Sequence, residues 1–200
     1  MKLFNNNVQN LLPYDGEAIY HEGVLDPIEA DKYFDIFLKE IAWVNDEAIM
    51  FGRRIITKRK VAWYGDADYK YSYSRIDRHA LPWIDSLRMI KQQIEETCGK
   101  TFNSCLLNLY HNGSEGMSWH SDDEKELGND PIIASLSLGV NRKFSFKHKQ
   151  TKATVSLALN HGSVLLMQGS TQHYWLHSLP KSTKITGPRI NLTFRNIIGG

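Results

Sequence analysis

Two side chains suited to metal binding stand two positions apart in the second half of the chain. His120 and Asp122 occupy positions i and i+2, so on an extended segment both point to the same side. A neutral imidazole and a carboxylate can then share one ion, with His177 as a candidate third ligand from a distant strand. Two histidines and one carboxylate on one face of a metal favour Fe(II) and leave coordination positions open for a cosubstrate and O2. The pattern is typical of a non-haem iron centre, and a chance occurrence of so short a pattern is the alternative.

A second set of polar side chains alternates strictly with apolar ones near the C-terminus. From Arg189 to Arg195 one face is polar and cationic, whereas Ile190, Leu192 and Phe194 share the other. Arginine is suited to bidentate capture of carboxylates, so we interpret the polar face as a dicarboxylate site; an exposed edge strand is the alternative. Six residues of strand span roughly 20 Å, so curvature must bring the guanidiniums together. Asn108 and Tyr110 share a face of an earlier segment in the same way, with ordinary packing of an amphipathic tyrosine as the alternative. The candidates are then Asn108, Tyr110, Arg189, Asn191, Thr193 and Arg195.

Helices are expected before the strands that carry these residues. Asp26-Pro27-Ile28-Glu29 combines an N-capping acid, a proline at the first helical position and a glutamate at the third, which is typical of a helix start. A second helix is expected from about Pro82 to Gly99. The apolar stripes expected to face the core are Ile28, Tyr33, Phe37 and Ile41 in the first helix, and Ile84, Leu87, Ile90 and Ile94 in the second.

After Gly99 the hydrophobic pattern changes to period two or to short apolar runs. Strands are expected near 103–110, 131–139, 142–148, 153–159, 163–168 and 189–197. Two helices followed by many short strands indicate an α+β fold whose catalytic body is a β-sandwich or jelly roll.

Length and composition indicate one domain that buries its own core, with 42% apolar residues in a chain of 200. Residues 1–50 carry 3 basic and 10 acidic side chains, a net −7, and residues 51–200 carry the other 21 and 12, a net +9. A basic body permits a polyanionic partner such as nucleic acid. No apolar run is long enough for a membrane span, no secretory signal is visible, and the two cysteines form no CxxC pair. We therefore expect an intracellular protein that is not secreted and does not enter a membrane.

Four stretches together resemble a known enzyme family: NLYHNGSEGMSWHSDDE, HGSVLLM, HYWLHSLP and PRINLTFR. In this order they are similar to the AlkB family of Fe(II)- and 2-oxoglutarate-dependent dioxygenases, most closely to its branch of animal nuclear DNA-repair demethylases. The resemblance runs from about Phe51 to the C-terminus. Residues 51–200 would combine nucleotide recognition with the dioxygenase core. Residues 1–50, which the resemblance does not cover, are expected to form an acidic N-terminal extension with a helix in the same domain.

The resemblance implies a double-stranded β-helix (jelly-roll) core, with N-terminal helices packed on the sheet. Its catalytic centre would be Fe(II) held by His120, Asp122 and His177, with 2-oxoglutarate and O2 as cosubstrates. A dianion beside a metal that has only one carboxylate ligand still needs cationic partners. In the family, the far carboxylate of 2-oxoglutarate would be held by Arg189 and Tyr110, and its metal-bound end would be supported by Arg195 and Asn191.

Aromatic and basic segments upstream are expected to recognise the substrate. Tyr69, Tyr71 and Tyr73 alternate with polar residues, and an ordinary strand with an aromatic core face is the alternative to a base pocket. By resemblance, Phe51 wedges into the base stack and the arginines that follow contact phosphates, with a solvated basic surface as the alternative. Two acids beyond the metal motif would contact the base or order the pocket. The expected substrate-binding residues are Phe51, Arg53, Arg59, Tyr71, Tyr73, Ser74, Asp123 and Glu124.

The activity implied by the resemblance is oxidative demethylation of N1-methyladenine and N3-methylcytosine in DNA, a direct-reversal repair that releases formaldehyde, succinate and CO2. A duplex base must first be extruded. The alternatives are the same chemistry on RNA or another substrate, and a nucleic-acid-binding module without catalysis. The short basic hairpin at Lys147–Lys152 leaves the preference for double strands open. We expect a monomer that binds alkylated DNA or RNA, cytoplasmic in a bacterium or nuclear in a eukaryote.

Overall fold

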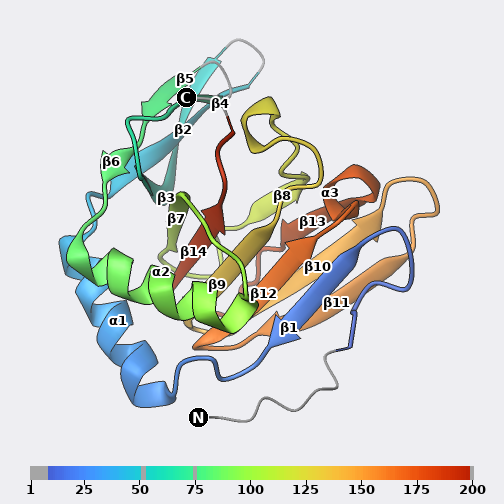
Figure 1. The fold of residues 1–200 in the computed structure, drawn as a ribbon, viewed down its shortest axis with the longest axis horizontal. Helices are drawn as coiled ribbons and strands as arrows, with labels where there is room; N and C mark the ends of the chain where they lie inside the picture. The colour runs from blue at the N-terminus through green and yellow to red at the C-terminus, as the bar shows by residue number, and fades with distance from the viewer. Residues whose placement is uncertain (1–8, 51–52, 74–75, 199–200) are drawn as a thin grey trace.

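Two mainly antiparallel sheets contain most of the strands (Figure 1). The computed structural model describes residues 9–50, 53–73 and 76–198, and at 48–50, 53–54, 71–73 and 76–78 it describes the backbone alone. The major sheet contains β1 (Glu17–His21), β2 (Val44–Met50), β3 (Arg53–Gly65), β6 (Leu81–Pro82), β7 (Ser104–Tyr110), β9 (Ile133–Gly139), β12 (Ser163–Gln168) and β14 (Arg189–Arg195). The minor sheet contains β8 (Met117–His120), β10 (Arg142–His148), β11 (Thr154–Leu159) and β13 (Trp175–Leu179). A separate hairpin pairs β4 (Lys70–Tyr73) with β5 (Ile76–His79).

The strand order interleaves early and late parts of the chain. The major sheet runs β1-β12-β9-β14-β7-β3-β2, with β6 beside β3, and the minor sheet runs β11-β10-β13-β8. Strands that are close in sequence are thus divided between the two sheets, as in a jelly roll. This confirms the double-stranded β-helix core. The strands predicted at 142–148 and 163–168 have those bounds in the structure, and each of the other four agrees at one end and differs by one or two residues at the other.

The first helix, α1 (Pro27–Glu40), begins as its sequence predicts. The Asp26 side chain accepts a hydrogen bond from the main-chain N–H of Glu29 at 2.9 Å, which satisfies one of the unpaired donors of the first turn. Tyr33 and Phe37 are buried, but Ile28 is 83% exposed, so its predicted place in the apolar stripe is wrong. Five residues at 100° each rotate Ile28 about 140° from Tyr33 around the helix.

The second helix, α2 (Asp85–Cys98), begins three residues later than expected because Leu81–Pro82 pairs as β6 with β3. It ends at Gly99, whose φ of 62° is the left-handed conformation that glycine adopts without strain. Short helical segments follow at Lys125–Leu127 (3-10) and at α3 (Thr171–Tyr174). No helix in the described part of the chain is long and apolar enough to cross a membrane.

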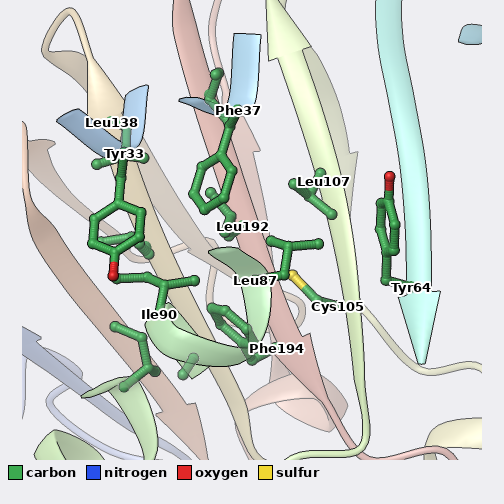
Figure 2. Close-up of a cluster of buried hydrophobic side chains, with 14 of the residues drawn as sticks. Tyr33, Phe37, Tyr64, Leu87, Ile90, Cys105, Leu107, Leu138, Leu192 and Phe194 are labelled. Atoms are coloured by element: carbon green, nitrogen blue, oxygen red, sulfur yellow. The ribbon is translucent and has the colours of Figure 1, made fainter. Parts of the chain in front are cut away.

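One apolar core lies between the helices and the major sheet (Figure 2). Tyr33 and Phe37 of α1 and Leu87 and Ile90 of α2 point toward the strands, and Phe37, Leu87 and Ile90 have no exposed surface. The strand residues beneath them come from β3, β7, β9 and β14 and include Tyr64, Cys105, Leu107, Leu138, Leu192 and Phe194. The N-terminal helices are therefore packed on the sheet, as expected.

A second apolar core fills the space between the two sheets. It joins Ile133 of β9 and Leu165 of β12 to Phe146 of β10 and Trp175 of β13, all four with 0% exposure. Polar side chains occupy the other end of the same inter-sheet space. The fold thus provides a cavity whose walls are the facing surfaces of two sheets.

Candidate active site

The three predicted metal ligands meet at one end of this cavity. His120 of β8 and His177 of β13 are cross-strand partners in the minor sheet, and Asp122 follows β8 two residues later. The Asp122 Oδ1 lies 3.7 Å from Nε2 of His120 and 3.9 Å from Nε2 of His177. One ligand atom from each residue lies within 4.8 Å of the other two. Such a set of two imidazoles and one carboxylate matches the donors that Fe(II) takes on one face.

The surroundings keep these side chains in their ligating forms. The His120 Nδ1 lies 2.8 Å from the Ser118 carbonyl oxygen; donation to that oxygen leaves Nε2 as the ligating atom. Burial lowers the pKa of His177 to about 4, so its ring is neutral at neutral pH. Burial alone would raise the pKa of Asp122, but Arg195 and the two histidines lower it below its usual range. The carboxylate is therefore ionised.

The main chain of Asp122 is held by a residue fifty positions away. Its N–H donates a hydrogen bond to the side-chain carbonyl of Gln172 at 3.0 Å, and Gln172 is only 1% exposed. The Lys149 Nζ donates to the Gln172 main-chain oxygen at 2.8 Å and lies 3.8 Å from the Asp123 carboxylate. These contacts join helix α3 to the loop after β8 and fix the position of Asp122.

Arg189 lies among polar residues on the major-sheet side of the same cavity. It is 1% exposed, and its Nη2 donates 2.8 Å hydrogen bonds to Ser137 Oγ and Asn191 Oδ1. Burial, opposed in part by Tyr110, lowers the pKa of Arg189 to about 10, so it stays charged. Its Nε has no hydrogen-bond partner among the described residues. A buried guanidinium bonded only to neutral groups is suited to an added carboxylate.

Cross-strand pairing brings the other predicted cosubstrate residues to the same wall. Tyr110 pairs with Arg189 and Asn108 with Asn191 between β7 and β14, and Asn191 Nδ2 donates to Thr193 Oγ1 at 2.8 Å. The two arginines do not meet at one point, because each lies beside a different part of the site. Arg189 lies beside the Tyr110 ring, whereas Arg195 Nη1 lies 3.8 Å from Asp122 Oδ2. All of the predicted metal and cosubstrate residues line the cavity: His120, Asp122, His177, Asn108, Tyr110, Arg189, Asn191, Thr193 and Arg195.

Arg59 lies in the cavity wall rather than on the surface. It is 8% exposed, forms an ion pair with Asp46, and donates to the Met117 sulfur at 3.1 Å. Its guanidinium also lies 5.9 Å from the centre of the Tyr110 ring. The expectation that Arg59 contacts phosphates does not agree with this burial, because its charge is already paired inside the fold.

The remaining predicted substrate residues are only partly described. Glu124 lines the cavity and Asp123 is exposed beside it. Phe51 and Ser74 lie outside the described residues, and the side chains of Arg53, Tyr71 and Tyr73 do so as well. The backbone places Tyr71 and Tyr73 in β4 and Arg53 at the start of β3.

Three residues that contact the site residues were missed from the sequence. Gln172 supports Asp122, and Ser137 binds Arg189, as described above. Arg142 is 1% exposed, lies 5.8 Å from the Tyr110 ring, and donates to the main-chain oxygens of Glu115 and Pro180 at 2.8 and 3.0 Å. Gln172 and Ser137 belong to no motif, and Arg142 stands beside Lys143 at the start of a strand that also contains Lys147, so nothing in the sequence distinguished it from a surface cation.

Comparison with known proteins agrees with this geometry. Residues 17–195 match the family described as the 2OG-Fe(II) oxygenase superfamily. The human "Alpha-ketoglutarate-dependent dioxygenase alkB homolog 3" is 40% identical over 187 residues, which are 88% of this chain and 65% of that protein. The human "DNA oxidative demethylase ALKBH2" is 39% identical over 181 residues, 85% of this chain and 69% of the relative.

The bovine alkB homolog 3 gives a similar result, at 41% identity over 88% of this chain and 64% of its own length. The chain thus spans slightly less than two thirds of the length of the alkB homolog 3 relatives. One solved structure, "The structure of OsALKBH1", superposes with a TM-score of 0.60 at 15% identity, covering 90% of this chain and 96% of that one, which shows the shared fold. The family match and the relatives together show that the chain belongs to the AlkB family of the 2OG-Fe(II) oxygenase superfamily.

Proposed function

We propose that this protein removes N-linked methyl groups from nucleic-acid bases by oxidation, with DNA as its substrate. Family membership implies Fe(II), 2-oxoglutarate and O2. The observation that carries the proposal is the single cavity that gathers the three metal-ligand candidates and the cosubstrate residues. The names of relatives at about 40% identity, one of them a DNA oxidative demethylase, support DNA as the substrate.

The chain's own residues would bind and orient the reactants. His120, Asp122 and His177 would hold the iron, and Arg189 with Tyr110 would bind the far carboxylate of 2-oxoglutarate. Arg195, 3.8 Å from Asp122, would balance the negative charge at the metal end. The bound metal and its cosubstrates supply the oxidation of the methyl group, which leaves as formaldehyde while 2-oxoglutarate becomes succinate and CO2.

An apolar wall would exclude water from the methylated base. Trp63, Leu106, Leu127 and Ile197 line the cavity together with the polar residues. Trp63, Leu127 and Ile197 belong to a separate buried cluster, against which Leu106 and Tyr69 pack. A base enclosed there is removed from its stack, at a cost of a few kcal/mol that is smallest for a single strand. N1-methyladenine and N3-methylcytosine are the proposed lesions because methylation at these positions blocks pairing and lowers that cost.

Formaldehyde release from methylated oligonucleotides tests the proposal. N1-methyladenine is presented in single-stranded DNA, duplex DNA and RNA of one sequence, with Fe(II), 2-oxoglutarate and ascorbate. Release from DNA that disappears in Asp122→Ala supports demethylation, and the ranking of the three substrates identifies the preferred one. Succinate formation without formaldehyde from any of them would contradict the nucleic-acid substrate while keeping the oxygenase.

Repair of DNA would place the protein in the cytoplasm of a bacterium or the nucleus of a eukaryote. We further propose that it acts as a monomer, since one chain supplies every residue of the cavity described above. Sedimentation of the metal-loaded protein with and without an oligonucleotide measures this directly, and a stable dimer in both conditions would contradict it.

A further inference from the structure

The minor sheet has an outer face that turns away from the major sheet and the cavity. Phe144 and Phe146 of β10 are buried in the core between the sheets. The alternating residues Lys143 and Lys147 must therefore project from the opposite face. The register between β13 and β8 shifts opposite Ser178, an irregularity of the kind that re-aims a side chain beside an active site.

Trp119 is the prominent side chain beside this irregularity. It is 40% exposed, and Lys147 reaches over its ring with Nζ 4.4 Å from the ring centre. The other tryptophans are less accessible: Trp63 and Trp83 are 8% exposed, Trp175 is 0% exposed, and Trp43 is half-buried. Trp119 makes no contribution to either apolar core of the sandwich. Trp119 therefore presents an aromatic ring outside both cores, with the Lys147 cation over it.

Charge identifies the kind of partner that this face fits. None of the minor-sheet strands contains an acidic residue, and the chain has no Asp or Glu after Asp130. Two acidic residues on the loop after β8 make their contacts away from Trp119 and Lys147. Asp122 lies in the cavity, and Asp123 accepts from Ser121 and lies 3.8 Å from Lys149 Nζ. The outer face is therefore cationic, with one aromatic ring and exposed hydroxyls, which is the composition that binds single-stranded nucleic acid.

The position of Trp119 connects this face to the cavity. Its strand, β8, is the last strand of the minor sheet. Met117 and His120 of the same strand line the cavity. One strand thus separates the cavity from the outer face, and a polynucleotide that leaves the cavity across β8 meets Trp119 next.

We propose that Trp119 and Lys147 form a binding surface for the single strand that flanks the methylated nucleotide. A neighbouring unpaired base stacks on the Trp119 ring, and Lys147 neutralises a phosphate beside it. This proposal rests on the proposed function, because it places the base to be demethylated in the cavity. It also explains how a chain with a short β10–β11 hairpin holds the strand.

The test compares long and minimal substrates in four variants. Trp119→Ala should raise the KM for a methylated 12-nucleotide single strand about tenfold, the loss expected for one stacked base. It should leave the KM for the methylated mononucleotide unchanged, since that ligand ends inside the cavity. Lys147→Ala should weaken binding of the strand and lower the salt slope by about one. Met89→Ala and Lys32→Ala are matched controls on α2 and α1, because both side chains are exposed on the helical layer.

Binding of an unmodified single strand provides a readout that does not need turnover. Tryptophan fluorescence should change on binding, and Trp119→Phe should lose that change while keeping most of the affinity, since phenylalanine also stacks. Equal increases in KM for the strand and the mononucleotide would overturn the proposal and make Trp119 a support for His120. Equally tight binding of polyglutamate would also overturn it, because that polymer has no bases.

The two proposals fail in different ways. If no methylated substrate is turned over but the strand still binds through Trp119, the binding surface stands and the demethylase does not. If turnover is normal and insensitive to Trp119 and Lys147 on every substrate, the demethylase stands and the surface is rejected.

Discussion

At the scale of single residues, the metal end depends on a main-chain hydrogen bond as well as on ligand side chains. The Asp122 N–H donates a hydrogen bond to Gln172, which is 1% exposed. This buried hydrogen bond holds the main chain of Asp122 and thereby the direction of its carboxylate. Groups that orient metal ligands from outside the coordination shell typically change metal affinity 10- to 100-fold when they are replaced.

Gln172→Leu should therefore weaken metal binding by about tenfold without unfolding the protein. Leucine has a similar volume but no acceptor, so the Asp122 N–H is left unpaired inside the fold. The affinity is measured by titrating Co(II) into the metal-free protein and following its visible absorption. Gln150→Leu, at an exposed position of the β10–β11 turn, is the matched control. Equal Co(II) affinities in the two variants would show that Gln172 does not position Asp122.

The sequence predicts a site well where a pattern repeats over a few residues. His120 with Asp122, and the alternation from Arg189 to Arg195, were visible because strand geometry alone determines which side chains share a face. Gln172 was invisible because it lies fifty residues from the atom it binds. Arg59 was assigned to the surface from its basic neighbours, and its partner Asp46 lies across the β2–β3 hairpin. Such a pair depends on which residues face each other across two strands, and a local sequence pattern does not determine that register.

At the scale of elements, α2 covers the part of β7 that leads to the cavity. Cys105 at the start of β7 is 0% exposed, and Cys98 lies half-buried in the last turn of α2. Burial raises the pKa of Cys98 to about 11 and that of Cys105 still further. Both residues are therefore thiols rather than thiolates at neutral pH.

Both thiols should react slowly with iodoacetamide in the native protein. The thiolate is the reactive form, so at pH 8 Cys98 should be labelled roughly 100-fold more slowly than an unperturbed thiol, and faster as the pH rises toward its pKa. Cys105 should remain unlabelled until denaturant is added. Mass spectrometry after a timed pulse measures both, and Cys98→Ser isolates Cys105. Rapid native labelling of Cys105 would mean that α2 does not cover β7 as described.

The helices illustrate what composition and periodicity can and cannot determine. Asp26 and Gly99 marked a helix start and a helix end correctly, because capping depends on local hydrogen bonds. Ile28 was assigned to the buried stripe, yet it faces solvent. The start of α2 was placed at Pro82 although that residue pairs with β3. The Ile28 error concerns the angular position of a residue around the helix, whereas the Pro82 error arose because a neighbouring strand decides where α2 begins.

At the scale of the whole molecule, the described part of the N-terminal segment, residues 9–50, contributes to both sheet and core. β1 pairs with β12 along five residues, and Thr171 Oγ1 bonds the main chain of Glu17 at both N and O. Phe37 of α1 contributes to the cluster that contains Leu192 and Phe194 of β14. We therefore propose that residues 1–50 and 51–200 unfold together.

Phe37→Ala should destabilise the whole protein by about 3–5 kcal/mol, the usual cost of removing a buried phenyl ring. Ile28→Ala in the same helix is the control and should change stability by less than about 0.5 kcal/mol, since Ile28 is 83% exposed. Urea unfolding is followed by far-ultraviolet circular dichroism and by tryptophan fluorescence. Coincident transitions are expected in all three proteins. An early transition confined to helix signal would separate the N-terminal part from the core.

Calorimetric titration of 2-oxoglutarate into anaerobic protein, with and without Fe(II), is the decisive measurement for this cavity. 2-Oxoglutarate should bind tightly only when iron is present. Arg189→Met should reduce that affinity by about 10- to 100-fold, the loss of a charge-assisted hydrogen bond, and leave iron affinity unchanged. Asp122→Ala should abolish both. Unchanged 2-oxoglutarate affinity in Arg189→Met would contradict the assignment of this cavity to the metal and its dicarboxylate cosubstrate.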